Sequence, residues 1–316
     1  MTDATVGVIA TGRIAVGLVT GHELAAPLSV YPPPSAAPEA GDEVEESDGD
    51  EVEDIHSMPM AAIAQTIARM VRELSDTHGV RPASAGLGFP GIIRNGVVEE
   101  SPNLKQAKGA RLAELLRCEL AGQGFDIPVD LCNDADAMAA GIAATKGQLE
   151  KLIRVWTLGN GIGFGRYPIT EGVWEGGHMV VTLDPKETYC GCGGRGHLEG
   201  IMGNRAMRLR FLDLEPEEVF LKARQKDARC AEFETLWHRA LAAATASSIH
   251  MGGPGKFFIS GPNARFVQVN LLNQFLHEMV TMTPLQGSVF EVVPTNEEIA
   301  IVGAAVNASR AAGQLV

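Results

Sequence analysis

Short apolar runs alternate with helix-type patterns along this chain, and this alternation limits its fold more than any other feature. Residues 6–10 and 14–19 predict two strands joined by a tight turn at Thr11-Gly12-Arg13. Apolar residues at helical spacing between Ile63 and Leu74 predict a helix that ends at Gly79. The same reasoning predicts strands at 85–89, 129–132, 154–158 and 257–260, and helices at about 110–122, 233–251 and 297–311. Such alternation is typical of a mixed α/β sheet.

The chain of 316 residues is long enough for two domains, since one domain takes roughly 100–200 residues. Its halves look like similar α/β units without an exact repeat, and both contain strands that run into glycine-rich turns. In the second half these turns are residues 159–165 and Gly261-Pro262-Asn263. Backbone N–H groups in such turns can bind phosphate, although glycine turns are also common in proteins that bind none.

The formal net charge of −13 is concentrated in one segment. Ten acidic residues lie between Glu39 and Asp54 without a single Lys or Arg, and setting these ten charges aside leaves −3 on the rest of the chain. The Pro-rich and acidic stretch 31–54 predicts a solvated loop, because so few apolar residues cannot offset the entropy of ordering it. Since no basic stripe is visible elsewhere, the composition argues against a nucleic-acid partner.

No segment of the sequence predicts a membrane span or a targeting signal. The first residues lack a basic and apolar leader pattern, and no run of about 18 apolar residues occurs. We therefore expect a cytoplasmic protein without a membrane partner. The five cysteines are an odd number in a long chain, which argues against a disulfide framework.

A compact set of metal-binding residue types occurs at His178, Cys190, Cys192 and His197. These donors are joined by glycines that allow the chain to wrap tightly, which fits a tetrahedral zinc site with two cysteines and two histidines. A C-x-C redox pair is the alternative, but it gives no reason for the two histidines. Because no catalytic base or open coordination position is indicated, we expect a structural zinc ion that holds a loop.

Asn133 and Asp134 follow a predicted strand and precede a predicted helix. Open α/β sheets bind their ligands at the carboxyl ends of strands, so Asp134 is placed to act as a general base. The alternative is that Asp134 only caps the helix. Glu175, His178 and Glu199 lie near the predicted zinc loop, and together with Asp134 they favour a polar pocket for a polyhydroxylated substrate.

Seven motifs occur in the order and near spacing of the ROK family of sugar kinases and sugar-responsive repressors, which the chain resembles over nearly its whole length. They are Gly88-Phe89-Pro90-Gly91, Ser101-Pro102-Asn103-Leu104, Asn133-Asp134, Leu158-Gly159-Asn160-Gly161-Ile162-Gly163, Glu175-Gly176-Gly177-His178, Cys190-Gly191-Cys192-Gly193-Gly194-Arg195-Gly196-His197-Leu198-Glu199 and Gly303-Ala304-Ala305. The resemblance implies an actin-like ATPase (ribonuclease H-like) fold, in which two similar α/β domains flank a cleft and the C-terminal helix returns to the first domain. It implies a small domain of residues 1–132 and 301–316 with the acidic segment 39–54 inserted, and a large domain of residues 133–300 that carries the zinc loop.

The resemblance also implies an ATP-dependent hexose kinase of the glucokinase type that uses Mg²⁺ and forms a homodimer. Asp134 would deprotonate the sugar hydroxyl that attacks the γ-phosphate in an in-line phosphoryl transfer. The sugar would be held by Asn103, Asn133, Asp134, Glu175, His178 and Glu199, and His178 would also bind zinc. The phosphates would face Gly12, Arg13, Asn160 and Gly161, and the adenosine would face Gly261 and Pro262.

The first phosphate motif departs from the family pattern of Asp, an apolar residue, two glycines, Thr and Lys. Aligning the strand at 14–19 puts Val8 at the aspartate and Ala10-Thr11-Gly12-Arg13 at Gly-Gly-Thr-Lys. That aspartate would orient hydrated Mg²⁺, which a valine cannot do, and an arginine is not equivalent to a lysine at a phosphate. The alternative function is therefore a catalytically impaired ROK-like sugar-binding or sensor protein.

Two further points follow from the resemblance. His197 stands where the family has its third cysteine, which keeps a zinc donor and removes one negative charge from the site. A DNA-binding repressor is not expected, because such members carry an added N-terminal helix-turn-helix domain and the resemblance here begins within the first ten residues.

Overall fold

The computed structural model describes residues 4–33, 55–101, 104–170, 172 and 174–314. Asn103, predicted to contact sugar, and the acidic segment 39–54 lie outside these residues. Within the described ranges, every helix is too short or too polar to cross a membrane.

The chain forms two compact units, Met1–Gly147 with Glu297–Val316 and Gln148–Asn296. This division differs from the predicted one because helix α3 (Asp134–Thr145) packs against helix α9 (Glu297–Ala311) in the first unit. A Cβ atom on Gly141 of α3 would lie 1.7 Å from the carbonyl oxygen of Ile299, so only glycine permits this approach. Both helices therefore belong to the first unit over their whole length.

The first unit is built around a six-stranded sheet. Its strands are β1 (Ala4–Ala10), β2 (Ile14–Thr20), β3 (Glu23–Leu24), β4 (Ser29–Tyr31), β5 (Pro82–Phe89) and β8 (Val129–Asn133). The order is β3-β2-β1-β5-β8, with β4 also paired to β2; β1 and β2 are antiparallel, whereas β1, β5 and β8 are parallel. A separate hairpin joins β6 (Ile92–Arg94) to β7 (Val97–Glu100), and a 3-10 helix follows at Lys105–Ala107.

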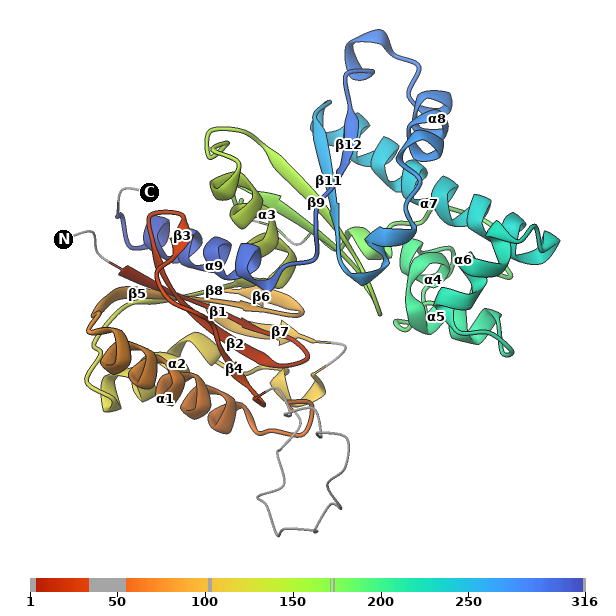
Figure 1. Ribbon diagram of the computed structural model, residues 1–316. Coiled ribbons are helices and arrows are strands. Elements are labelled where there is room, and N and C mark those ends of the chain that lie inside the picture. Colours follow the sequence, from red (N-terminus) through yellow and green to blue (C-terminus); the bar gives the residue numbers. More distant parts are fainter. Residues whose placement is uncertain (1–3, 34–54, 102–103, 171, 173, 315–316) are drawn as a thin grey trace, which may run out of the picture. The chain divides into compact units, whose positions relative to one another are not determined.

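Helices cover both faces of this sheet, with α1 (Met60–His78) and α2 (Leu112–Gly122) on one side and α3 and α9 on the other (Figure 1). The predicted apolar face of α1 is buried, from Ile63 to Leu74, and packs with Val6 and Val8 of β1 in the core. Gly79 caps α1 in the left-handed conformation, as predicted. The prediction that the C-terminal helix returns to the first unit is confirmed, since α9 contacts β1 and β5.

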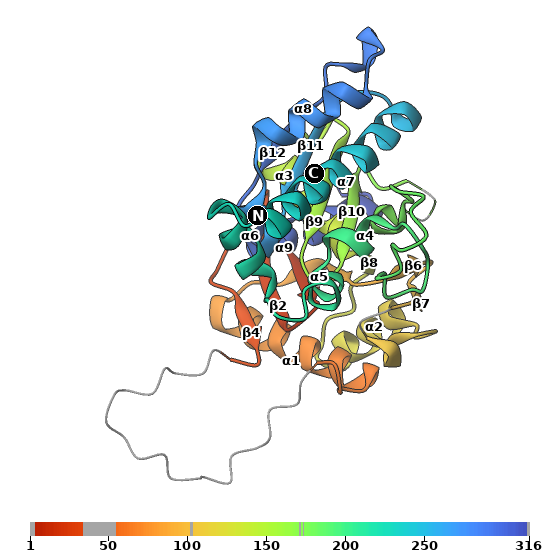
Figure 2. The same ribbon diagram turned by 90° about the vertical axis from the view of Figure 1, so that its right-hand side faces the viewer.

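The second unit has a four-stranded sheet in the order β10-β9-β11-β12. Strands β9 (Ile153–Leu158), β11 (Lys256–Ser260) and β12 (Val289–Val292) are parallel, and β10 (Ile162–Tyr167) is antiparallel to β9. The helices of this unit are α4 (Leu198–Met202), α5 (Asn204–Arg210), α6 (Pro216–Arg224), α7 (Ala228–Gly252) and α8 (Val269–Met279). Helix α7 runs beside the sheet (Figure 2). Short 3-10 helices occur at Gly176–His178, Pro262–Phe266 and Thr283–Leu285.

Two predictions for the second unit were wrong in extent. The predicted glycine turn 159–165 is a turn only as far as Gly161, because Ile162–Tyr167 form β10 and pair with β9 along their whole length. The helix predicted from 233 starts at Ala228, because the side chain of Asp227 accepts a hydrogen bond from Cys230 N at 2.9 Å and caps an earlier turn. In the first place strand pairing outweighed the glycine pattern, and in the second a cap extended the helix beyond its apolar pattern.

His238 of α7 makes the stability of the protein depend on pH. Its side chain is fully buried, with Nδ1 2.8 Å from the carbonyl oxygen of Glu234 and Nε2 2.9 Å from the N–H of Gln268. The Nε2 atom must accept this bond, so the ring is neutral. Burial lowers the pKa of His238, so in mildly acidic solution the unfolded chain binds a proton at this residue more readily than the folded protein does.

The neutral ring of His238 therefore contributes its full stabilisation above the pKa of the unfolded state, about 6.5. This contribution is lost as the pH falls from there through the lower pKa of the folded state. We expect the midpoint of urea unfolding to decrease as the pH is lowered from 7 to 5. The decrease should be smaller in His238→Gln, because glutamine does not titrate. An equal dependence of the urea midpoint on pH in the variant and the unaltered protein would contradict this role of His238.

Candidate functional site

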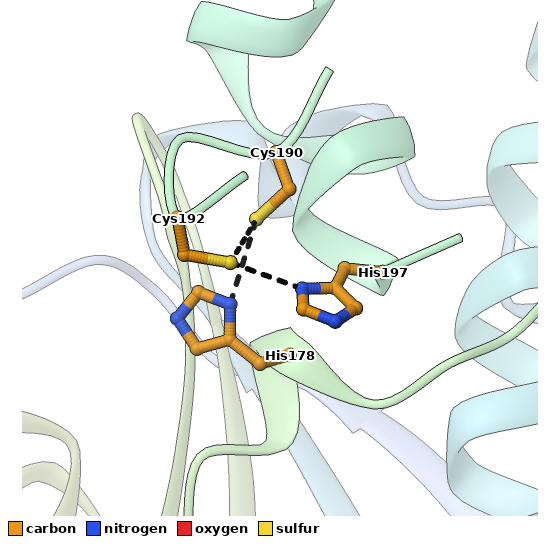
Figure 3. A group of neighbouring side chains, drawn as sticks. All are labelled: His178, Cys190, Cys192 and His197. Atoms are coloured by element: carbon orange, nitrogen blue, oxygen red, sulfur yellow. Dashed lines mark hydrogen bonds between the residues drawn. The ribbon is translucent and has the colours of Figure 1, made fainter. Parts of the chain in front are cut away.

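Four side chains of types that can bind a metal ion gather in the second unit, and we call this cluster the knuckle: His178, Cys190, Cys192 and His197. Their potential ligand atoms all lie within 4.8 Å of one another (Figure 3). Cys190 Sγ is 3.5 Å from His178 Nδ1 and 3.3 Å from Cys192 Sγ, which is 3.3 Å from His197 Nδ1. His178 ends the 3-10 helix at Gly176–His178, and His197 directly precedes α4.

The knuckle has the donors and the size for a tetrahedral zinc ion. With Zn–S and Zn–N bonds of about 2.3 and about 2.0 Å, such a site needs an S–S separation of about 3.8 Å and S–N separations of about 3.5 Å. The S–N distances of 3.3 and 3.5 Å agree with this, and the S–S distance of 3.3 Å needs only a small outward shift of one thiol. Two thiolates and two imidazoles would complete the coordination without an open position.

The electrostatics of the knuckle favour binding of a cation over a free thiolate. Burial raises the pKa of the Cys190 thiol to about 12; the backbone N–H of Cys192 opposes this shift, whereas the Cys192 thiol and Glu199 act in the same direction as burial. Burial also lowers the pKa of His197, so its ring is neutral and can donate a lone pair. A bound cation would displace the thiol protons and offset the negative charge of the two thiolates, of which only that of Cys190 is buried.

Residues outside the knuckle fix the loop that carries it. Gly196 adopts a φ of +68°, and its N–H donates to the carbonyl oxygen of Glu187 at 2.8 Å. Arg210 of α5 binds the Glu187 carboxylate through two nitrogens at 3.1 and 2.5 Å and stacks on the ring of Tyr189 at 4.5 Å. The sequence does not reveal the roles of Arg210 and Glu187, because neither belongs to a motif and only the packing of α5 brings them together.

Glu175 and Glu199, predicted to bind sugar, lie at the knuckle. Glu175 Oε2 is 3.8 Å from His178 Nε2, on the opposite side of the ring from the thiols. Glu199 accepts a hydrogen bond from the N–H of Ile162 at 3.1 Å, and its other oxygen is 3.8 Å from Cys190 Sγ. Burial raises the pKa of Glu175, with Glu199 contributing and His178 opposing.

The turns at 159–161 and 261–263 lie side by side at the carboxyl ends of the parallel strands β9 and β11. Asn204 at the start of α5 joins them, because its N–H donates to Gly159 O at 3.1 Å and its side chain accepts from Asn263 at 2.7 Å. Asn160 is exposed, and a Cβ on Gly161 would lie 2.7 Å from Glu199 Oε2. The predicted phosphate turn thus borders the predicted sugar residues.

Gly261 and Pro262, predicted to face adenosine, form the second of these turns. Gly261 has a φ of +94°, and Pro262 is exposed at the start of a 3-10 helix. A Cβ on Gly159 would lie 3.5 Å from the Pro262 ring, which shows how closely the two turns approach.

Asn133, rather than Asp134, caps α3 in the first unit. Asn133 Oδ1 accepts from Ala135 N at 2.8 Å, and its Nδ2 donates to Gly91 O at 2.9 Å. These bonds engage the side chain that we expected to hold sugar. Asp134 is the half-buried first residue of α3, directly after β8, and does not supply the cap.

The structure shows what replaces the family's first phosphate motif in this chain. Val8 is fully buried in the core, so no metal ligand is present at this position. The guanidinium of Arg13 binds the carboxylate of Glu297 through Nε at 2.9 Å and Nη2 at 2.6 Å. Gly12 lies beside Arg13 in the exposed turn between β1 and β2.

The sequence profile of the ROK family matches residues 40–309. The chain belongs to the ROK family. The profile match begins after the β1–β2 hairpin, where the first phosphate motif departs from the family pattern. The fold is the actin-like ATPase fold, as predicted: the ROK hexokinase from Thermus thermophilus superposes with a TM-score of 0.75 over 98% of this chain and 99% of that one, at 22% identity.

Two curated relatives are described as kinases. The glucokinase of Pyrobaculum calidifontis is 29% identical over 218 residues, which are 64% of this chain and 67% of the relative. The N-acetylmannosamine kinase of Haemophilus influenzae is 31% identical over 170 residues. The second match spans 50% of this chain and about half, 55%, of the relative.

Proposed function

We propose that this ROK protein is an ATP-dependent hexose kinase of the glucokinase type. The observation that carries the proposal is the position of Glu199, which touches both Cys190 of the knuckle and the N–H of Ile162 next to the 159–161 turn. The carboxylates and imidazole expected to bind sugar hydroxyls thereby border the turn expected to bind phosphate. The kinase relatives support the same activity.

In the proposed reaction, Asp134 accepts the proton of the attacking sugar hydroxyl while Glu175, His178 and Glu199 hold the remaining hydroxyls. The turns at Asn160-Gly161 and Gly261-Pro262 would orient the nucleotide, and a Mg²⁺ ion bound with it would supply positive charge to the phosphates. Val8 cannot ligate this ion, so the first motif contributes less to metal and nucleotide binding than the family pattern provides. A structural zinc ion held by Cys190, Cys192, His197 and His178 would keep the ring of His178 in place.

A coupled assay of ADP release, with glucose, mannose, N-acetylglucosamine and N-acetylmannosamine as acceptors, tests the proposal. We expect sugar-dependent release of ADP with at least one acceptor, and polyphosphate and other nucleoside triphosphates serve as alternative donors. Absence of turnover with every combination of sugar and donor would reject it. Sedimentation of the same preparation tests the proposed homodimer.

A sugar-binding protein without catalysis is the second candidate, and buried Val8 together with the Arg13–Glu297 ion pair favours it. It predicts that a sugar raises the thermal midpoint whereas MgATP does not. Tight binding of MgATP in calorimetry would exclude this candidate.

A further inference from the structure

Trp174 is an exposed aromatic residue directly before Glu175 in the chain. The sequence contains three tryptophans, of which Trp156 and Trp237 are completely buried, whereas Trp174 is 41% exposed. The carbonyl oxygen of Trp174 accepts a hydrogen bond from Gly176 N at 2.9 Å, so the tryptophan is part of the turn that leads to His178. The proposed function gives this side chain no role.

The segment from Trp174 to His178 runs along one row of side chains on β10. The row consists of the alternate residues Ile162, Phe164 and Arg166, which point to the same face of the strand. Gly177 lies against the first, since its Cβ would be 3.4 Å from the Cβ of Ile162, and Gly176 lies against the second, since its Cβ would be 2.5 Å from the Cβ of Phe164. Trp174 lies over the third, with Arg166 Cζ 4.4 Å from the ring centroid.

This arrangement gives the indole a fixed support. The guanidinium of Arg166 stacks on the ring in cation–π geometry, which restrains the side chain before any ligand binds. The exposed part of the ring remains accessible to a ligand, and Glu175, with its carboxylate, is the next residue in the chain. Sites for small polar ligands combine such an aromatic surface with a few polar groups, the aromatic surface taking the apolar part of the ligand.

We propose that Trp174 forms the apolar wall of the sugar site and packs against the C–H face of the pyranose whose hydroxyls bind Glu175 and His178. This inference rests on the proposed function, because it needs a sugar at the knuckle. A pyranose presents axial C–H groups on one face and hydroxyls at its edge; in the proposed pose the C–H groups would meet the indole, and the hydroxyls would meet the carboxylate that follows it in the chain. Trp174 is then a specificity-determining residue, since an axial hydroxyl on that face would prevent the contact.

Fluorescence tests the inference directly, because only one of the three tryptophans is exposed. Acrylamide should quench Trp174 in the free protein, and glucose or N-acetylmannosamine should reduce this quenching and change the emission. Trp174→Ala is expected to raise the sugar KM and Kd about tenfold, with kcat changed less than about twofold, and Trp174→Phe is expected to restore most of the affinity. Met251→Ala, an 85% exposed apolar side chain at the end of α7, is the matched control and should leave both constants unchanged.

The outcomes separate this inference from the kinase proposal. A sugar that binds in calorimetry without altering Trp174 quenching, and with equal KM in Trp174→Ala, overturns the inference and leaves the kinase proposal standing. If neither sugar nor any other hexose of the panel binds in calorimetry, the kinase proposal falls and the apolar wall falls with it.

Discussion

Asp134→Asn is expected to lower kcat for sugar phosphorylation by about 10²–10⁴-fold, the range typical of losing a general base. Asparagine has the same shape as aspartate but cannot accept the proton of the attacking hydroxyl at neutral pH. Asp134 is placed for this role because it is the first residue of α3, directly after β8. The helix is capped by Asn133 and not by the Asp134 carboxylate. Sugar affinity, measured by calorimetry, should change only a few-fold.

Asp136→Asn is the matched control for this substitution. Asp136 lies in the same first turn of α3 and is also half-buried, so both variants remove one favourable charge from the helix N-terminus, worth about 0.3–1 kcal/mol. Thermal unfolding should therefore shift similarly in both, whereas only Asp134→Asn should lose turnover. Equal kinetic losses in the two variants, or full activity in Asp134→Asn, would refute the assignment of the base.

Cys190→Ser is expected to remove zinc from the protein and to weaken sugar binding. Purified protein should contain about one zinc ion per chain, and loss of a direct ligand should lower zinc affinity by at least about 100-fold, beyond the 10–100-fold typical of an outer-shell partner. Cys190 contacts His178 and Glu199 as well as Cys192, so the sugar residues should lose their support. We expect the sugar Kd to rise about tenfold, equivalent to about 1.4 kcal/mol.

Cys118→Ser provides the control, because Cys118 is an exposed free cysteine on α2 of the first unit. Metal analysis and thermal unfolding with and without a chelator should not distinguish it from the unaltered protein. A well-folded protein that contains no metal and keeps its thermal midpoint in chelator would refute the zinc assignment.

Helices and strands with a strong local signal were predictable from the sequence. The C-terminal helix was predicted at 297–311 and occurs at Glu297–Ala311, and α1 ends at the glycine that its apolar pattern indicated. The prediction failed where the local pattern was ambiguous. Gly163 and Gly165 read as turn residues, but in β10 they alternate with Ile162 and Phe164 and pair with β9. Glycine is compatible with either structure, so only pairing decided between them.

The knuckle was predictable from the sequence, because its four residues lie close in the chain and the glycines between them allow the tight wrapping that brings them together. Which further side chains support or restrict the site became visible only when the packing of the helices and strands was known. Arg210 reaches Glu187 only through the packing of α5, and Arg13 meets Glu297 across nearly the whole length of the chain. Such contacts depend on where whole elements pack, and neither spacing nor residue type reports that placement.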